Sequence, residues 1–136
     1  MTQNKTIEDI LQNYHTIAVV GFSSKKERAG YYVPAYLQKH GYRIIPINPK
    51  LEQGLGERAY PNLLKVPHTI EVVLIFQRSE AVLPFVEQAI QIEAKAVWMQ
   101  LGIQHLEAAE QAQRGGLKIV MDACMMVEHR NRAKSD

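Results

Sequence analysis

The stretch Ile17-Ala18-Val19-Val20-Gly21-Phe22-Ser23-Ser24, residues 17–24, decides the fold of this chain. Its first half is an apolar run, which indicates a buried strand. Gly21 then predicts a tight turn into a helix, because glycine lets the backbone turn sharply and approach another group closely. Such a turn presents free N–H groups and the positive end of a helix dipole, which both favour an anion. Taken alone, the turn is equally consistent with a plain connection between a strand and a helix.

The side chains after the turn strengthen its attraction for phosphate. Ser23 and Ser24 supply hydroxyl donors, and Lys25, Lys26 and Arg28 supply positive charge nearby. The pattern is neither G-x-G-x-x-G nor the Walker A sequence, so the motif alone names no ligand.

Five short apolar runs recur at intervals of about 22 to 28 residues, and we interpret them as strands. They are continuous rather than alternating, which is typical of parallel strands that are buried on both faces. Pro46 lies inside the second run, and the usual Rossmann order places that strand away from a sheet edge, where a missing N–H is disfavoured. The five runs are 17–20, 44–47, 72–76, 96–99 and 119–121.

Segments with helical spacing lie between these runs. Alternating strands and helices of such lengths predict an α/β domain, namely a Rossmann-like doubly wound sheet of about five parallel strands with helices on both faces. A further short helix is expected before the first strand, at about residues 6–14, with Thr6 as its N-cap. The other expected helices are 31–40 closed by Gly41, 79–92 with its start uncertain because of Pro84, and 104–114 ending at Gly115-Gly116.

Length and composition fit one globular domain spanning residues 1–136, with 46 % hydrophobic and 22 % charged residues and a polar tail at about 130–136. A net charge of +2 is too mild to indicate a nucleic-acid partner. The apolar runs are far shorter than the ~20 residues that cross a bilayer, so no membrane association is expected. The N-terminus lacks a signal-peptide pattern, which predicts a cytoplasmic location.

Cysteine and histidine usage argues against a disulfide and against a metal. Cys124 is the only cysteine, which excludes an internal disulfide and any multi-cysteine motif. The histidines at 15, 40, 68 and 105 are scattered and show no metal-ligand spacing. We therefore expect no metal site.

Ligands of open parallel sheets bind outside the carboxyl ends of the strands, where the strand order reverses. The segment Asn48-Pro49-Lys50 follows the second strand, where an NAD site usually carries an acidic residue that holds the ribose. Lys50 would instead attract a phosphate, although it also fits a solvated lysine in a turn. The segments that meet at this edge are 21–24, 48–50, 77–79, 100–102 and 122–124.

Taken together, these motifs resemble the small stand-alone CoA-binding domain family, which is similar to the N-terminal CoA-binding domain of the succinyl-CoA synthetase α subunit. The resemblance spans roughly residues 14–130, in order and at matching spacing. It is carried by Val-Val-Gly-Phe-Ser-Ser at 19–24, Arg28, Tyr-Val-Pro at 32–34, Pro-Ile-Asn-Pro-Lys at 46–50, Ile-Phe-Gln-Arg-Ser-Glu at 75–80, Val-Trp-Met-Gln-Leu-Gly-Ile at 97–103 and Asp-Ala-Cys-Met-Met-Val-Glu-His at 122–129.

The resemblance implies a single Rossmann-like domain that binds coenzyme A or an acyl-CoA and lacks the phosphohistidine and ligase domains of the synthetase. It also implies which positions contact the ligand. These are Gly21, Phe22, Ser23 and Ser24 at the pyrophosphate; Arg28 and Lys50 at phosphate charge; Asn48 and Pro49 shaping the nucleotide pocket; Phe76, Gln77 and Arg78 along the adenine or pantetheine path; and Gln100 and Gly102 in the next loop.

The expected function is a non-catalytic binding or regulatory module, which holds CoA or presents it to a partner. Two enzymatic alternatives remain. The first is an NADP-linked oxidoreductase, because Lys50 tolerates the 2′-phosphate of NADP. The second is an acyl-CoA enzyme that uses Cys124 as nucleophile, with Asp122, Glu128 and His129 close in sequence. The sequence leaves open the acyl group, any protein partner and the oligomeric state.

Overall fold

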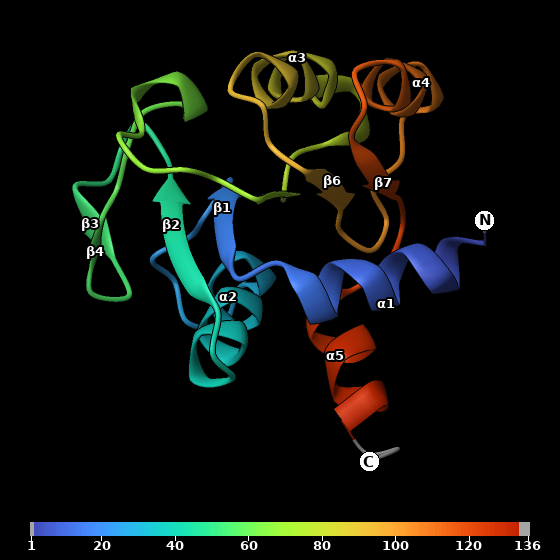
Figure 1. Cartoon of the computed structure of the whole chain (residues 1–136). Helices are drawn as coiled ribbons and strands as arrows, with labels where there is room; N and C mark the ends of the chain where they lie inside the picture. Colours follow the sequence, from blue (N-terminus) through green and yellow to red (C-terminus); the bar gives the residue numbers. More distant parts are fainter. Residues whose placement is uncertain (1, 134–136) are drawn as a thin grey trace.

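A parallel sheet of five strands forms the centre of the computed structural model, which describes residues 2–133 (Figure 1). Its strands are β1 Thr16–Val20, β2 Arg43–Ile47, β5 Val72–Ile75, β6 Ala96–Met99 and β7 Lys118–Val120, each within one residue of the apolar run that predicted it. The spatial order is β2-β1-β5-β6-β7, so the chain first moves outward to one side of β1 and then to the other side from β5 onward. This order confirms the predicted doubly wound, Rossmann-like sheet.

Helices cover both faces of the sheet, because each strand buries alternate side chains on opposite sides. In β1, Ile17 and Val19 pack on the face of α1, α2 and α5, whereas Ala18 and Val20 pack on the face of α3 and α4 (Figure 1). None of the helices within residues 2–133 has the length and hydropathy of a membrane span. The helix bounds are α1 Gln3–Asn13, α2 Ala29–Lys39, α3 Leu83–Gln91, α4 Leu106–Arg114 and α5 Met125–Ala133.

Pro46 lies on an edge strand, so the expectation that the second strand sits away from an edge is wrong. The β2 strand pairs with β1 on one side only. On its outer side the Pro46 carbonyl oxygen accepts a hydrogen bond from the Tyr60 N–H at 3.0 Å. Because the N–H and C=O of one strand residue point to the same side, the N–H that proline lacks would point away from β1. The sheet therefore loses no ladder hydrogen bond at Pro46.

All four predicted helices begin at other residues than expected, α2 and α4 by two residues and α1 and α3 by more. Helix α1 starts at Gln3, and its N-cap is Thr2, whose hydroxyl accepts from the Lys5 N–H at 3.3 Å, rather than Thr6. The segment predicted as one helix over 79–92 is split into a short 3-10 turn, η2 Ser79–Ala81, and α3. Pro84 explains the split, since proline is tolerated only in the first turn of a helix.

Three small elements had no counterpart in the sequence prediction. They are a hairpin of two short strands, β3 Gln53–Gly54 and β4 Glu57–Arg58, the 3-10 turn η1 Leu63–Lys65, and helix α5. Helix α5 runs to Ala133, so the part of the predicted polar tail at 130–133 is helical, and 134–136 lie outside the described residues. The hairpin flanks β2 and closes that side of the molecule (Figure 1).

Candidate functional site

The loops after β1 and β5 touch at the point where the strand order reverses. Gly21, directly after β1, has a φ of +85°, and a Cβ placed on it would lie 2.5 Å from the Phe76 carbonyl oxygen. Any larger residue would therefore be strained and would push the two loops apart. The Gly21 N–H donates to the Ile47 carbonyl oxygen at 3.1 Å, which also ties the turn to β2. Glycine is thus required here by both the backbone angle and the space.

A second glycine, which the sequence analysis did not single out, brings helix α2 against the turn. A Cβ on Gly30 would lie 2.9 Å from the Gly21 carbonyl oxygen. The Gly30 carbonyl oxygen accepts from the Ser23 N–H at 3.2 Å. Since the first N–H groups of a helix have no acceptor within it, the start of α2 directs donors and a positive dipole toward the turn. A glycine nine residues after Gly21, at the start of the expected helix, was the available signal.

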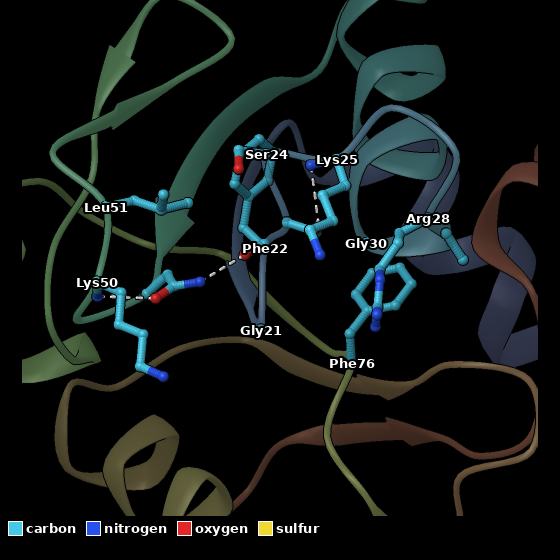
Figure 2. A pocket seen from close by; sticks show the side chains of 12 residues that line it. Gly21, Phe22, Ser24, Lys25, Arg28, Gly30, Lys50, Leu51 and Phe76 are labelled. Carbon is cyan, nitrogen blue, oxygen red and sulfur yellow. Dashed lines mark hydrogen bonds between the residues drawn. The ribbon is translucent and has the colours of Figure 1, made fainter.

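A pocket of about 650 Å³ opens over this turn (Figure 2). Three exposed cations line it: Lys25 and Arg28 from the loop between β1 and α2, and Lys50 from the loop after β2. None of the lining residues is acidic. The combination of backbone donors, hydroxyl groups and cations is suited to phosphate groups. The remaining lining residues are Gly21, Phe22, Ser23, Ser24, Ala29, Gly30, Asn48, Leu51 and Phe76.

Asn48 joins two walls of this pocket through its side-chain amide. Its Nδ2 donates to the Phe22 carbonyl oxygen at 2.8 Å, and its Oδ1 accepts from the Lys50 N–H at 2.8 Å. The side chain therefore fixes the loop after β2 to the turn after β1. Pro49 lines a neighbouring cavity of about 370 Å³ that shares Lys50 with the pocket.

A second pocket, of about 540 Å³, adjoins the first across Ala29 and Phe76, which line both. Arg78 lies at its rim, with a side chain that is 85 % exposed and 3.6 Å from the Glu80 carboxylate. Five residues predicted for the site line this second pocket, together with six that were not assigned to a binding role. The predicted residues are Phe76, Gln77, Arg78, Gln100 and Gly102, and the others are Ala29, Tyr32, Ser79, Leu101, Ile103 and Cys124.

The loop after β6 forms one wall of the second pocket. Gln100 is only 5 % exposed, and its Oε1 accepts from the Met125 N–H, at the start of α5, at 3.3 Å. Gly102 has a φ of +84°, and its N–H donates to Asp122 Oδ1 at 2.7 Å. The loops after β6 and β7 are therefore fixed to each other at this edge of the sheet.

The acidic and histidine side chains that follow Cys124 in sequence have other partners. His129 Nδ1 forms a hydrogen bond of 2.9 Å with the Tyr36 hydroxyl, and burial followed by the nearby His40 charge lowers the pKa of His129. Glu128 forms an ion pair with Arg132 at 2.8 Å. No group of three or more potential metal ligands occurs within residues 2–133.

The structure brings all the residues predicted for the site to one edge of the sheet, around three adjoining cavities. Their contact with a ligand stays a prediction. The residues are Gly21, Phe22, Ser23, Ser24, Arg28, Asn48, Pro49, Lys50, Phe76, Gln77, Arg78, Gln100 and Gly102.

The sheet order, the glycine turn and the basic pocket define a Rossmann-like α/β domain with an anion-binding edge. Comparison with known proteins identifies the family: residues 15–130 match the model of the CoA binding domain, and the chain belongs to this family. The uncharacterised protein YneT of Bacillus subtilis is 35 % identical over 123 residues, which cover 90 % of this chain and 91 % of YneT.

Solved structures confirm the fold. A hypothetical protein from Pyrococcus horikoshii OT3 superimposes with a TM-score of 0.91 at 44 % identity, covering 96 % of this chain and 92 % of that one. A Thermus thermophilus protein gives a TM-score of 0.89 at 31 % identity, covering 96 % of this chain and 98 % of that one.

A longer relative contains a segment similar to this chain. An ADP-forming acetate–CoA ligase of Archaeoglobus fulgidus is 26 % identical over 119 residues, which cover 80 % of this chain but only 17 % of the ligase. The chain thus corresponds to a small part of that enzyme.

Proposed function

We propose that this chain binds coenzyme A reversibly at the carboxyl edge of its parallel sheet. One observation carries the proposal: the Gly21 turn is packed against the start of α2, and Lys25, Arg28 and Lys50 line the pocket above it. The Ser23 and Ser24 hydroxyls of the turn, and the first N–H groups of α2, which have no acceptor within the helix, can donate to the pyrophosphate of CoA. Lys50 or Arg28 would hold the 3′-phosphate. Membership in the CoA binding domain family supports the same ligand.

The loop after β2 favours CoA over NAD. A dinucleotide site of the Rossmann type usually places a carboxylate here to bind the ribose hydroxyls. In this chain Asn48 occupies the position, and both polar atoms of its amide already bond to the backbone. Lys50 beside it adds positive charge, which suits the phosphorylated ribose of CoA.

We further propose a binding or regulatory role without chemistry of its own. The Cys124 thiol lines the second pocket, but His129 and Glu128 are held by other partners. The similar segment in the acetate–CoA ligase makes up only 17 % of that enzyme, so a CoA-binding module can be joined to other parts. In this chain the module would hold CoA or present it to a separate protein.

Native mass spectrometry of the purified protein, followed by denaturation and identification of the released small molecules, tests the proposal. We expect CoA or an acyl-CoA at up to one per chain, and restoration of the complex when CoA is added to stripped protein. Recovery of NADP with no CoA species, and no binding of added CoA, would establish the NADP-linked alternative instead.

A further inference from the structure

Two pockets of opposite chemical character meet at the shared wall of Ala29 and Phe76. The first is basic, through Lys25, Arg28 and Lys50. The second is lined mainly by apolar side chains, which are Ala29, Tyr32, Phe76, Leu101, Ile103 and the weakly polar Cys124. A ligand that fills both must be anionic at one end and apolar at the other.

The second pocket is suited to an uncharged group. Arg78 is its only charged lining residue, and that side chain is 85 % exposed at the rim and faces Glu80. Burying a carboxylate or an ammonium among the apolar side chains would leave the charge unpaired, which is unfavourable. At the same time Leu101 is 64 % exposed at this pocket, so an apolar ligand group would cover surface that now faces water.

Gln100, which lines this pocket, has one unused hydrogen-bond donor. Its Oε1 accepts from the Met125 N–H, and this contact fixes which end of the amide faces α5, because an NH₂ group does not accept. Its Nε2 makes no hydrogen bond with the rest of residues 2–133, although the residue is only 5 % exposed. In the described part of the chain, only Arg132 Nε is a side-chain polar atom that is both fully buried and without a partner. Gln100 Nε2 has no partner either, so it must retain some contact with solvent. A nearly buried donor at an open pocket needs an acceptor.

We propose that the second pocket holds the acyl end of an acyl-CoA thioester, and that Gln100 Nε2 donates to the thioester carbonyl oxygen. The chain then prefers CoA that carries an uncharged, apolar acyl group of about butyryl size over free CoA. This inference rests on the proposed CoA binding, since the phosphates in the first pocket set the direction of the ligand. It makes Gln100 and the Leu101 side chain determinants of ligand specificity.

Titration calorimetry with free CoA, acetyl-CoA, butyryl-CoA and succinyl-CoA tests the preference. Each methylene group removed from water is worth about fourfold in affinity, so butyryl-CoA is expected to bind about tenfold or more tighter than free CoA. Acetyl-CoA should fall between them. Equal affinities for free CoA and butyryl-CoA would overturn the inference, as would tighter binding of succinyl-CoA than of butyryl-CoA, which would assign a charged acyl group to Arg78.

Variants of the second pocket separate an acyl site from a site for the pantetheine arm. Leu101→Glu introduces a charge at an exposed position and should lower the affinity ratio of butyryl-CoA to CoA by about tenfold. Leu106→Glu is the matched control, because Leu106 is 71 % exposed and lines neither pocket, and the ratio should not change. An unchanged ratio in Leu101→Glu would count against an acyl group in this pocket.

Gln100→Glu tests the proposed hydrogen bond directly. The carboxylate keeps an acceptor for the Met125 N–H at the start of α5 and replaces the donor that faces the pocket. Binding of butyryl-CoA should weaken about tenfold more than binding of CoA. If both ligands weaken equally, Gln100 contacts a group that they share, and the thioester contact is wrong.

The same titrations distinguish failure of this inference from failure of the proposed function. Lys50→Ala acts on the basic pocket and should weaken all four ligands by a similar factor. If none of the ligands binds the unmodified protein, CoA binding itself is wrong and the inference falls with it. If CoA binds and its acyl derivatives bind no tighter, only the acyl site is wrong.

Discussion

Lys50 and Arg28 line the same pocket from different loops, and both residues are exposed. We expect Lys50→Ala and Arg28→Ala each to weaken CoA binding and to leave the fold intact. A charge-assisted hydrogen bond contributes about 1.5 to 3 kcal/mol, which corresponds to a loss of roughly tenfold or more. Titration calorimetry measures the loss, with Lys39→Ala, on the far end of α2, as a control. Parental affinity in both variants would show that the phosphates bind elsewhere.

Gly30 has no charge, but its lack of a side chain lets α2 approach the Gly21 turn. In Gly30→Ala the new Cβ meets the Gly21 carbonyl oxygen at 2.9 Å, so the start of α2 must move away from the turn. We expect weaker CoA binding, because backbone donors lose their position on the pyrophosphate. Gly115→Ala is a matched control: its Cβ meets side-chain carbons of Ile90 at 3.0 Å or more, and Gly115 lines neither pocket. Calorimetry and thermal unfolding together check the result, and unaltered binding by a folded Gly30→Ala would remove α2 from the site.

In the proposed function, the Cys124 thiol does not contribute to CoA binding. Cys124 lines the second pocket, whereas the phosphate groups of CoA would bind in the first. We therefore expect Cys124→Ser to bind CoA with nearly the parental affinity. Calorimetry on a variant with an unchanged circular dichroism spectrum checks this. Loss of binding there would support a reaction at the thiol.

Sequence patterns predict where a residue lies along the sheet better than they predict which residues it contacts. The residues 21–24 and 48–50 were predicted at the binding edge because strand ends and turns are encoded locally. Gly30 was missed, because its function depends on the distance between a helix and a turn that are separated along the chain. The two hydrogen bonds of Asn48 and the burial of Gln100 were missed for the same reason.

Helix α5 packs against α2 through a cluster of rings rather than through a strong apolar stripe. His129 bonds to the Tyr36 hydroxyl, and its ring centroid lies 5.2 Å from that of His40 and 5.7 Å from that of Tyr42. Such a helix has little apolar periodicity, which explains why the sequence did not predict it. The β3–β4 hairpin escaped prediction because strands of two residues carry no periodicity. The five sheet strands were predicted because each is apolar on both faces.

Because His129 lies in this ring cluster, we expect the free energy of unfolding to depend on pH. Burial and the neighbouring His40 lower the pKa of His129 below the ordinary histidine value of about 6.5. The unfolded chain therefore binds a proton at a higher pH than the folded chain does. The free energy of unfolding should fall as the pH drops below about 6.5, until the folded-state pKa is passed. Urea unfolding between pH 8 and pH 5 measures the decline, and His129→Gln should flatten it; an equal slope in that variant would assign the effect to another group.

At the scale of the whole molecule, the sheet order explains why the predicted residues meet. The chain winds to one side of β1 and to the other side from β5 onward, so α2 and α3 cover opposite faces of the sheet and a crevice opens beyond the two touching loops. The second pocket continues this crevice beyond the end of β6, and the cavity of about 370 Å³ continues it beyond the end of β2. The sequence predicted the five strands but not their order, because pairing between strands depends on contacts across the chain. Pro46 shows the consequence, since only the true order places it at an edge.

The ranking of ligands follows from matching the charges of this crevice to those of its ligand. CoA carries a pyrophosphate and a 3′-phosphate, dephospho-CoA lacks the 3′-phosphate, and NAD also lacks it and adds a second ribose. If the Gly21 turn holds the pyrophosphate and Lys50 or Arg28 holds the 3′-phosphate, affinity should fall in that order.

Thermal shift at equal ligand concentrations measures this ranking. A ligand at about 100 times its dissociation constant stabilises the folded state by roughly 2.7 kcal/mol, which raises Tm by about 2 to 8 °C in a domain of this size. Added salt should shrink the shift with CoA, because ions screen the phosphate contacts. A larger shift with NAD than with CoA would reject CoA as the ligand. Equal shifts with CoA and dephospho-CoA would reject only the 3′-phosphate contact, since the turn would then supply the binding energy through the pyrophosphate alone.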